Sequence, residues 1–205
     1  MKNLIKLLSF NTFIPFFYPA LMLPLRPFRK KAIERLNFKP GDKVLIPGVG
    51  TGHDLPFIPK DADVTGIDIS DVMLGIGNAK LKVFRRAGHT ELVKMDAEEL
   101  RFDDGTFDKA ILSLFLTVVF DPKKAFAEIV RVTKPGGEIL IYDHLMRKGG
   151  MPEKVLKPIE SILRYSFASV TRSLDDIIEG QPVEVKESFT GDAVGFVKGF
   201  LLIRK

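Results

Sequence analysis

The sequence predicts an α/β protein in which helices flank a seven-stranded, mostly parallel sheet, preceded by an apolar and basic helical arm. Two observations carry this prediction. After residue 40, short apolar runs alternate with helical stretches, the pattern typical of a parallel sheet with crossover helices. The 205 residues are 45% hydrophobic and 28% charged, so the chain has enough apolar material to bury one sizeable core.

Seven runs are expected to be strands because each is short, apolar and bounded by turn-forming residues. Five come before residue 145 and two follow the last helical stretch. The predicted strands span residues 43–47, 63–69, 91–95, 109–114, 138–142, 183–189 and 194–203. Pro135-Gly136-Gly137 is expected to form the turn that leads into the fifth strand.

Helices are predicted between these strands and in the N-terminal arm. They span residues 4–10, 26–36, 72–84, 123–132 and 153–167. Asp121 and Pro122 precede the fourth of them, so we expect Asp121 to cap it and Pro122 to lie in its first turn. Met73, Leu74 and Val83 lie at helical spacing and are expected in the core.

The formal net charge of +5 is concentrated at the N-terminus. Residues 1–36 hold seven basic residues and one acidic residue, a net of +6, so residues 37–205 sum to −1. A near-neutral body argues against a protein that grips duplex nucleic acid, and we expect no nucleic-acid partner. The chain has no cysteine and three histidines, so we predict neither disulfides nor a metal site.

We therefore divide the chain into an arm, residues 1–36, and a domain, residues 37–205. Three prolines interrupt the apolar stretch of the arm, so we predict neither a membrane-spanning helix nor a signal peptide there. Aromatic residues beside basic ones suit the surface of an anionic membrane, although the same aromatics would also suit a lid over a pocket. The basic residues concerned are Arg26, Arg29, Lys30, Lys31 and Arg35.

The first predicted strand of the domain runs into a glycine-rich turn, Gly48-Val49-Gly50-Thr51-Gly52. Glycines at alternate positions let the backbone turn tightly and approach a ligand closely. Asp68 ends the second predicted strand, 18 residues after Gly50. A carboxylate at this position can accept both hydroxyl groups of a ribose. The pair predicts a nucleoside site.

Together with Val93-Lys94-Met95-Asp96-Ala97 and Lys134-Pro135-Gly136-Gly137, this turn resembles the class I S-adenosylmethionine-dependent methyltransferases, which have a Rossmann-like fold. The resemblance covers residues 40–145. It implies S-adenosyl-L-methionine as cofactor, S-adenosyl-L-homocysteine as product and no metal. The residues that it places around the cofactor are Gly48, Gly50, Gly52, Asp68, Ile69, Asp96, Ala97, Ser113 and Leu114.

The chain departs from this family at one position. An acid usually stands two residues before the first glycine, and here that residue is Ile46. The ammonium group of the methionine end must then be held otherwise, and His53 and Asp54 are possible substitutes. Capping of a short helix is the other interpretation of Asp54.

Further segments bear on the methyl acceptor. The chain lacks the Asn/Asp-Pro-Pro-Tyr/Phe element of nucleic-acid amino-methyltransferases and the paired-glutamate loop of protein arginine methyltransferases. It resembles instead the bacterial phosphatidylethanolamine N-methyltransferases of the quinone-methyltransferase-like type. This likeness is carried by residues 15–18 with Pro24 and the basic helix 26–36, and by residues 48–56, 116–122, 142–145 and 158–175.

The resemblance implies N-methylation of a phosphatidylethanolamine-like amine by a cytoplasmic enzyme held at the inner face of the membrane. In this interpretation Tyr18 folds over the sulfonium, His144 takes a proton or binds phosphate, and Asp143 pairs with the headgroup ammonium. Arg164 contacts phosphate in the same interpretation. Packing for Tyr18, a turn for His144 and a solvated helix face for Arg164 stay open as structural alternatives.

Two other functions stay open. C-methylation of a lipophilic quinone precursor would equally explain the apolar arm. A protein that binds the donor and docks on a membrane without catalysis is favoured by Ile46. The oligomeric state does not follow from the sequence.

Overall fold

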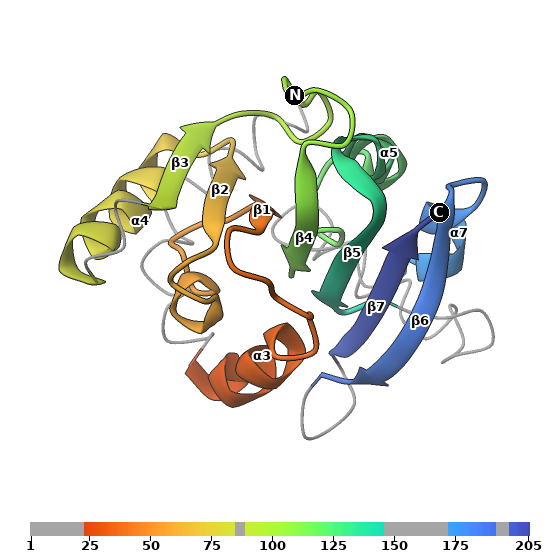
Figure 1. The fold of residues 1–205 in the computed structure, drawn as a ribbon, viewed down its shortest axis with the longest axis horizontal. Helices are drawn as coiled ribbons and strands as arrows, with labels where there is room; N and C mark the ends of the chain where they lie inside the picture. The colour runs from red at the N-terminus through yellow and green to blue at the C-terminus, as the bar shows by residue number, and fades with distance from the viewer. Residues whose placement is uncertain (1–22, 85–88, 146–171, 192–196) are drawn as a thin grey trace, which may run out of the picture.

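The computed structural model describes residues 23–84, 89–145, 172–191 and 197–205. Within these residues the strands form a seven-stranded sheet in the order β3-β2-β1-β4-β5-β7-β6, with β3 and β6 at its edges (Figure 1). The strands are β1 (Lys43–Pro47), β2 (Asp63–Asp68), β3 (Thr90–Lys94), β4 (Phe107–Ser113), β5 (Thr133–Asp143), β6 (Val183–Thr190) and β7 (Lys198–Arg204). The first five are mutually parallel, and β7 runs antiparallel between β5 and β6. The predicted fold class is confirmed.

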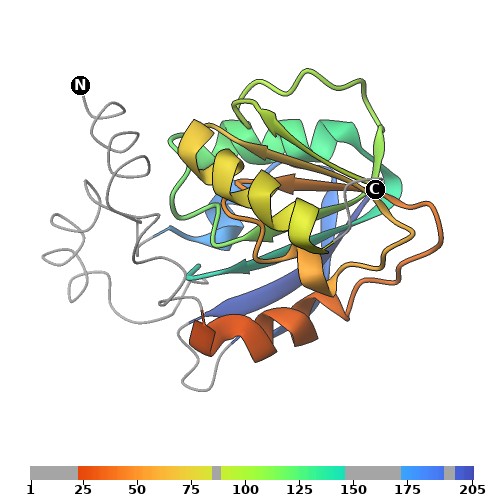
Figure 2. The same cartoon turned by 90° about the vertical axis from the view of Figure 1, so that its left-hand side faces the viewer.

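Helices cover both faces of this sheet. Buried side chains of α3 (Arg26–Ile33) and α4 (Asp71–Phe84) pack on one face, and those of α5 (Pro122–Val132) and α7 (Leu174–Ile178) on the other. Figure 2 views the sheet nearly edge-on, with α3 and α5 on opposite sides of it. Two short 3-10 turns, η1 (Leu23–Leu25) and η2 (Leu55–Phe57), complete the described elements.

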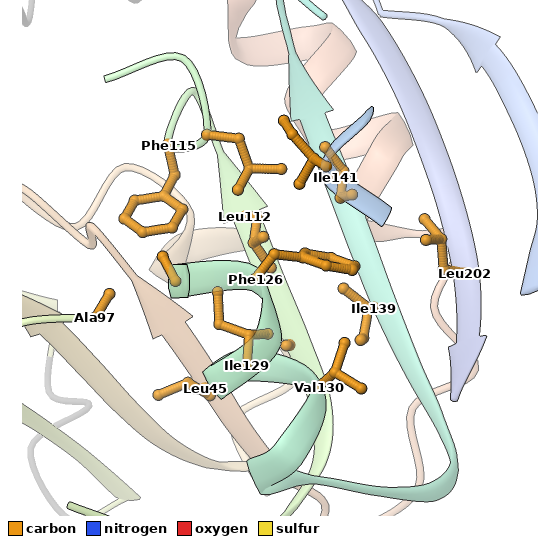
Figure 3. Packing of buried hydrophobic residues seen from close by; sticks show 14 of the residues in the cluster. Leu45, Ala97, Leu112, Phe115, Phe126, Ile129, Val130, Ile139, Ile141 and Leu202 are labelled. Carbon is orange, nitrogen blue, oxygen red and sulfur yellow. The ribbon is translucent and has the colours of Figure 1, made fainter. Parts of the chain in front are cut away.

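The central strands are apolar along their length because helices cover them on both faces. On the α5 face, Phe126 and Ile129 of the helix pack against Leu112 of β4 and Ile139 of β5 (Figure 3). All four side chains are fully buried. The sheet is therefore a rigid platform, and ligand-binding groups can project only from its ends.

The described part of the arm belongs to the core. Ala32, Ile33 and Leu36 are buried in the same apolar cluster as Val44 of β1 and Leu140 of β5. α3 therefore forms part of the layer that covers this face of the sheet. This packing fixes the position of its basic side chains.

Several helix and strand boundaries lie close to those predicted from local sequence signals. Asp121 caps α5 as predicted, since its Oδ1 accepts hydrogen bonds from the backbone N–H groups of Lys123 and Lys124 at 3.1 and 3.0 Å. β5 begins at Thr133, earlier than expected, and so includes the predicted Pro-Gly-Gly turn. The core prediction is wrong for Val83, which is 77% exposed near the end of α4. The helices predicted over residues 4–10 and 153–167 lie outside the described residues.

Candidate active site

The strand order reverses between β1 and β4, because the chain builds β2 and β3 on one side of β1 and adds β4 and β5 on the other. In open α/β sheets, ligands bind outside the carboxyl ends of the strands at such a point. The glycine turn that follows β1 and the loop that follows β4 meet here. A Cβ atom on Gly48 would lie 2.6 Å from Cδ2 of Phe115, so only glycine lets these two segments approach so closely.

The central glycine of the turn binds the acid at the end of β2. Gly50 has φ of +54°, and a Cβ atom there would meet nothing nearer than 3.9 Å, so the backbone lines an open cradle. Its N–H donates to Oδ2 of Asp68 at 2.9 Å, and the N–H of Ser70 donates to Oδ1 at 2.9 Å. Burial raises the pKa of the Asp68 carboxyl, against the effect of these backbone hydrogen bonds. The carboxylate can still accept further donors, because each oxygen carries two lone pairs.

The chain that leaves β3 brings Asp96, the second predicted acid, to the edge of the sheet where β2 ends. The N–H of Met95 donates to the carbonyl oxygen of Asp68 at 3.1 Å, which holds the chain after β3 against the end of β2. The following Asp96 is exposed, whereas Ala97 is 7% exposed and packs in the core. Ile69 is half-buried beside them. Asp68, Ile69, Asp96 and Ala97 therefore lie along one edge of the cradle.

Lys80 of α4 stabilises the glycine turn, a contact that the sequence analysis missed. Its Nζ donates to the carbonyl oxygen of Thr51 at 3.1 Å and to Oγ1 of the same residue at 3.2 Å. Partial burial lowers the pKa of Lys80. Gly77 lies one turn earlier on the helix, where a Cβ atom would lie 3.3 Å from the carbonyl oxygen of Gly50. The spacing of Gly77 and Lys80 was the available signal, because residues three apart share a helix face.

Asp54 lies at the other edge of the cradle, in a buried polar cluster. Its Oδ1 pairs with Nη1 of Arg29 at 2.8 Å and accepts a 3.0 Å hydrogen bond from Oγ of Ser113. Both side chains of the ion pair are 4% exposed. Asp54 precedes η2 but makes no side-chain capping bond, so the helix-capping interpretation is wrong. Ile46 packs in the apolar core at 1% exposure.

The membrane-facing prediction is wrong for Arg29. Its guanidinium is buried against Asp54 and lies 5.9 Å from the centre of the Tyr142 ring. The signal was present in the sequence: Arg29, Ala32, Ile33 and Leu36 have the spacing of one helix face, and all four are buried. Lys30 and Lys31 lie on the other face and are exposed, as are Arg26 and Arg35. Arg35 also pairs with Glu187 at 2.6 Å.

His53 lies between the glycine turn and Asp54 and is half-buried. Burial lowers the pKa of its imidazole to about 4, and the positive charges of Lys80 and Arg29 act in the same direction. A neutral ring at pH 7 carries no positive charge into the cradle. It also offers no negative charge, so Asp54 is the better candidate of the two to bind an ammonium group.

The loops after β4 and β5 are joined through Asp143. Its Oδ1 accepts hydrogen bonds from Thr117 Oγ1 at 2.6 Å and from the backbone N–H of His144 at 2.8 Å, while Oδ2 accepts from the Thr117 N–H at 3.1 Å. The residue is 0% exposed, and burial raises the pKa of its carboxyl. The prediction that Asp143 pairs with a headgroup ammonium is therefore corrected: its carboxylate is turned inward and holds the two loops together.

Two further features shape the loop after β4. Leu114 has φ of +52°, a left-handed conformation that residues with side chains rarely adopt and that often marks functional sites. Arg172 lies within residues 158–175, which the sequence analysis gave only as a range, and its guanidinium donates to the carbonyl oxygens of Leu116, Val119 and Phe120. Backbone contacts of this kind cannot be foreseen from residue type. They fix the loop beside the half-buried His144.

Tyr18 and Arg164 lie outside the described residues. Among the residues that the structure does describe, no helix is both long and apolar enough to cross a membrane.

Comparisons with known proteins agree that the chain contains a methyltransferase domain. A family model for a methyltransferase domain matches residues 45–141. A phosphatidylethanolamine N-methyltransferase of Cereibacter sphaeroides is 34% identical over 170 residues, which cover 79% of this chain and 83% of the relative. A demethylmenaquinone methyltransferase of Renibacterium salmoninarum is 36% identical over 117 residues, which cover 57% of this chain and 47% of the relative. The chain thus matches about half the length of that second relative.

One solved structure gives a measure of the likeness in fold. It is geranyl diphosphate C-methyltransferase from Streptomyces coelicolor A3(2), in complex with Mg²⁺, geranyl diphosphate and S-adenosyl-L-homocysteine. The TM-score is 0.74 at 15% identity, over 86% of this chain and 78% of that chain. At this identity the likeness concerns the fold alone.

Proposed function

Because this chain belongs to the class I S-adenosylmethionine-dependent methyltransferases, we propose that its methyl acceptor is the amine headgroup of a phospholipid. The acceptor would be phosphatidylethanolamine or a related aminolipid, methylated on nitrogen at a membrane surface. The observation that carries this proposal is the extent of the likeness to the phosphatidylethanolamine N-methyltransferase, which covers most of both chains. The demethylmenaquinone methyltransferase matches over a shorter stretch of this chain.

The described residues fit the donor. Asp68 is a half-buried carboxylate beside an open glycine cradle, which suits the two hydroxyl groups of a ribose. Asp96, with Ile69 and Ala97, would hold the adenine along the same edge. Gly48, Gly50 and Gly52 would lie against the methionine end, and Ser113 and Leu114 would line it from β4. When bound, the donor supplies a methyl group already activated by a sulfonium.

The chain's own residues then have to present a neutral amine to that methyl group. An ammonium has no lone pair for an in-line displacement, so its proton must leave before the methyl is transferred. His144 follows β5 at the carboxyl edge of the sheet, and its backbone N–H is held by Asp143. We assign His144 as the base. Tyr18 would shield the reacting amine from water, and Arg164 would bind the lipid phosphate.

The exposed face of α3 would dock the enzyme on an anionic surface. Arg26, Lys30, Lys31 and Arg35 are exposed on one helix and its first following residues. A basic side chain near an anionic bilayer contributes about 1 kcal/mol, so a cluster of this size supports reversible attachment. α3 also carries Arg29, which pairs with Asp54. The proposed docking surface would therefore lie on an element that contacts the proposed donor site.

Ring C-methylation of a lipophilic quinone precursor is the second candidate, because two relatives named as quinone-pathway methyltransferases reach 36% and 34% identity over 57% and 58% of this chain. A donor-binding protein without catalysis is the third, and it rested on Ile46. Asp54 weakens that interpretation, since a buried carboxylate follows the glycine turn in a chain that has Ile46 in place of the family's usual acid.

Incubation with methyl-labelled donor and a total lipid extract, followed by chromatography of the lipids, tests the proposal. Label in an N-methylated phospholipid is the expected result. Label in a quinone fraction would support the second candidate, and absence of label from every lipid would remove the lipid acceptor.

A further inference from the structure

The carboxylate of Asp54 is bound asymmetrically. Within the described residues, both of its hydrogen-bond donors, Arg29 and Ser113, contact Oδ1. Oδ2 of the same carboxylate receives no hydrogen bond from them. The residue is 3% exposed, and a buried carboxylate oxygen gains from a cationic donor because little water competes there.

The place of this carboxylate in the fold is equally specific. Asp54 lies two residues after Gly52, at the end of the turn that forms the cradle. Ser113, which contacts it, is the last residue of β4, the strand on the other side of the point where the strand order reverses. A group bound between these two segments would lie beside Asp54, whereas both oxygens of the Asp68 carboxylate already accept backbone hydrogen bonds, from Gly50 and Ser70.

Arg29 holds the carboxylate in this position. Its Nη1 contacts the oxygen that Ser113 also contacts, so the two donors hold Oδ1 in place and leave Oδ2 without a hydrogen bond from either of them. The ion pair offsets part of the cost of removing this carboxylate from water. Arg29 is therefore a positioning residue, and it comes from α3, outside the glycine turn.

We propose that Asp54 accepts the α-ammonium of the donor's methionine end through Oδ2, with Arg29 and Ser113 holding its carboxylate in place. Asp54 thus does the work of the acid that Ile46 replaces. The assignment rests on donor binding alone. It would survive if the acceptor were a quinone and not a lipid amine.

Binding of two ligands to the full-length chain tests the assignment. They are S-adenosyl-L-homocysteine and its deaminated analogue, in which hydrogen replaces the α-amino group. The wild type should bind the first roughly tenfold or more tightly than the second, because a hydrogen bond to a charged group is lost with the amine. Asp54→Asn should remove most of this difference by weakening the first ligand, while its affinity for the deaminated analogue stays within about twofold.

Glu138→Gln is the matched control, since Glu138 also belongs to a buried ion pair, with Lys109 at 2.8 Å. Lys109 lies near the start of β4, whereas Ser113 is the last residue of that strand. This variant should keep the wild-type preference for S-adenosyl-L-homocysteine over the deaminated analogue, whatever its stability. Ser113→Ala retains the carboxylate and its ion pair, so it should give a smaller loss confined to the ligand that carries the amine. Arg29→Lys should keep more of the preference than Arg29→Met.

Three results would overturn the assignment. The first is equal binding of the two ligands by the wild type. The second is an Asp54→Asn protein that keeps the preference, and the third is an Asp54→Asn protein that loses both ligands equally, as a purely structural ion pair predicts. If that variant does not fold, Ser113→Ala decides: an unchanged preference, or equal loss of both ligands, contradicts the role of Asp54.

Discussion

The backbone N–H of Gly50 donates a 2.9 Å hydrogen bond to Oδ2 of Asp68, so the turn after β1 and the end of β2 hold each other in place. The bond also turns the carboxylate toward the cradle that the glycine leaves open. Under the proposed ribose contact, donor recognition and loop geometry would depend on one side chain. Changes at either residue should affect donor binding more than folding.

Asp68→Ala should weaken donor binding by about 100-fold, because two hydrogen bonds to a charged acceptor are lost together. Isothermal titration with S-adenosyl-L-homocysteine measures the effect. Asp63→Ala is the matched control, because Asp63 begins the same strand and is exposed at the opposite end. Affinity within about twofold of wild type is expected for the control. Retained affinity in Asp68→Ala would show that the ribose assignment is wrong.

Gly48→Ala should destabilise the fold by about 3 kcal/mol, because the new methyl group combines a left-handed backbone with a clash. The φ of Gly48 is +64°, and its Cβ position lies 2.6 Å from the Phe115 ring. Gly41→Ala separates the two causes, since Gly41 has φ of +79° but no atom within 4 Å of its Cβ position. We expect about 1 kcal/mol there. Urea unfolding measures the free energy of unfolding of both variants. Equal losses of stability would contradict the close packing of Phe115 on the turn.

His53 should make folding stability depend on pH between about 6.5 and 4. Burial lowers the pKa of the folded imidazole to about 4, from 6.5 when solvated. In that window the unfolded chain binds a proton that the folded chain does not, so the free energy of unfolding falls as the pH falls. His53→Gln should lose less stability than wild type between pH 7.5 and 5. Identical losses in parallel urea titrations would show that the ring is solvated.

Exchanging Lys30 and Lys31 for glutamate should weaken binding to anionic vesicles by roughly tenfold or more, at about 1 kcal/mol for each basic charge removed. The matched control makes the same change at Lys123 and Lys124, which begin α5 on the opposite face of the sheet. Cosedimentation with phosphatidylserine vesicles at two salt concentrations measures the effect. Equal losses in both variants would mean that α3 is not the docking face.

The fold followed from the sequence to within a few residues because its signals are local. Alternating strand and helix patterns, the Asp121 cap and the glycine turn each depend on neighbours along the chain. The error at Val83 arose because helical spacing identifies a face only where that face is covered. β5 extends to Thr133 because Thr133 pairs with Phe107 of β4, a contact between distant residues.

The geometry of the glycine turn could be predicted because a motif defines it, whereas polar contacts that depend on packing were missed. Gly50 and Asp68 have a spacing that leaves few alternatives. Helical spacing places Arg29 on the buried face of α3, but its partner Asp54 depends on how α3 lies on the sheet, which that spacing does not specify. Asp143 was expected to meet a ligand, because residue type and position do not say whether a carboxylate turns outward or, as here, toward Thr117.

The most direct test of the central claim is a competition between defined acceptors. Purified protein is given donor carrying a ¹³C methyl group, with equal amounts of phosphatidylethanolamine and demethylmenaquinone in mixed anionic vesicles. Mass spectrometry then locates the label. We predict ¹³C on the headgroup nitrogen of the phospholipid, and a His144→Ala protein that still binds donor should lose this product. Label on the quinone ring, with none on the headgroup, would contradict the account.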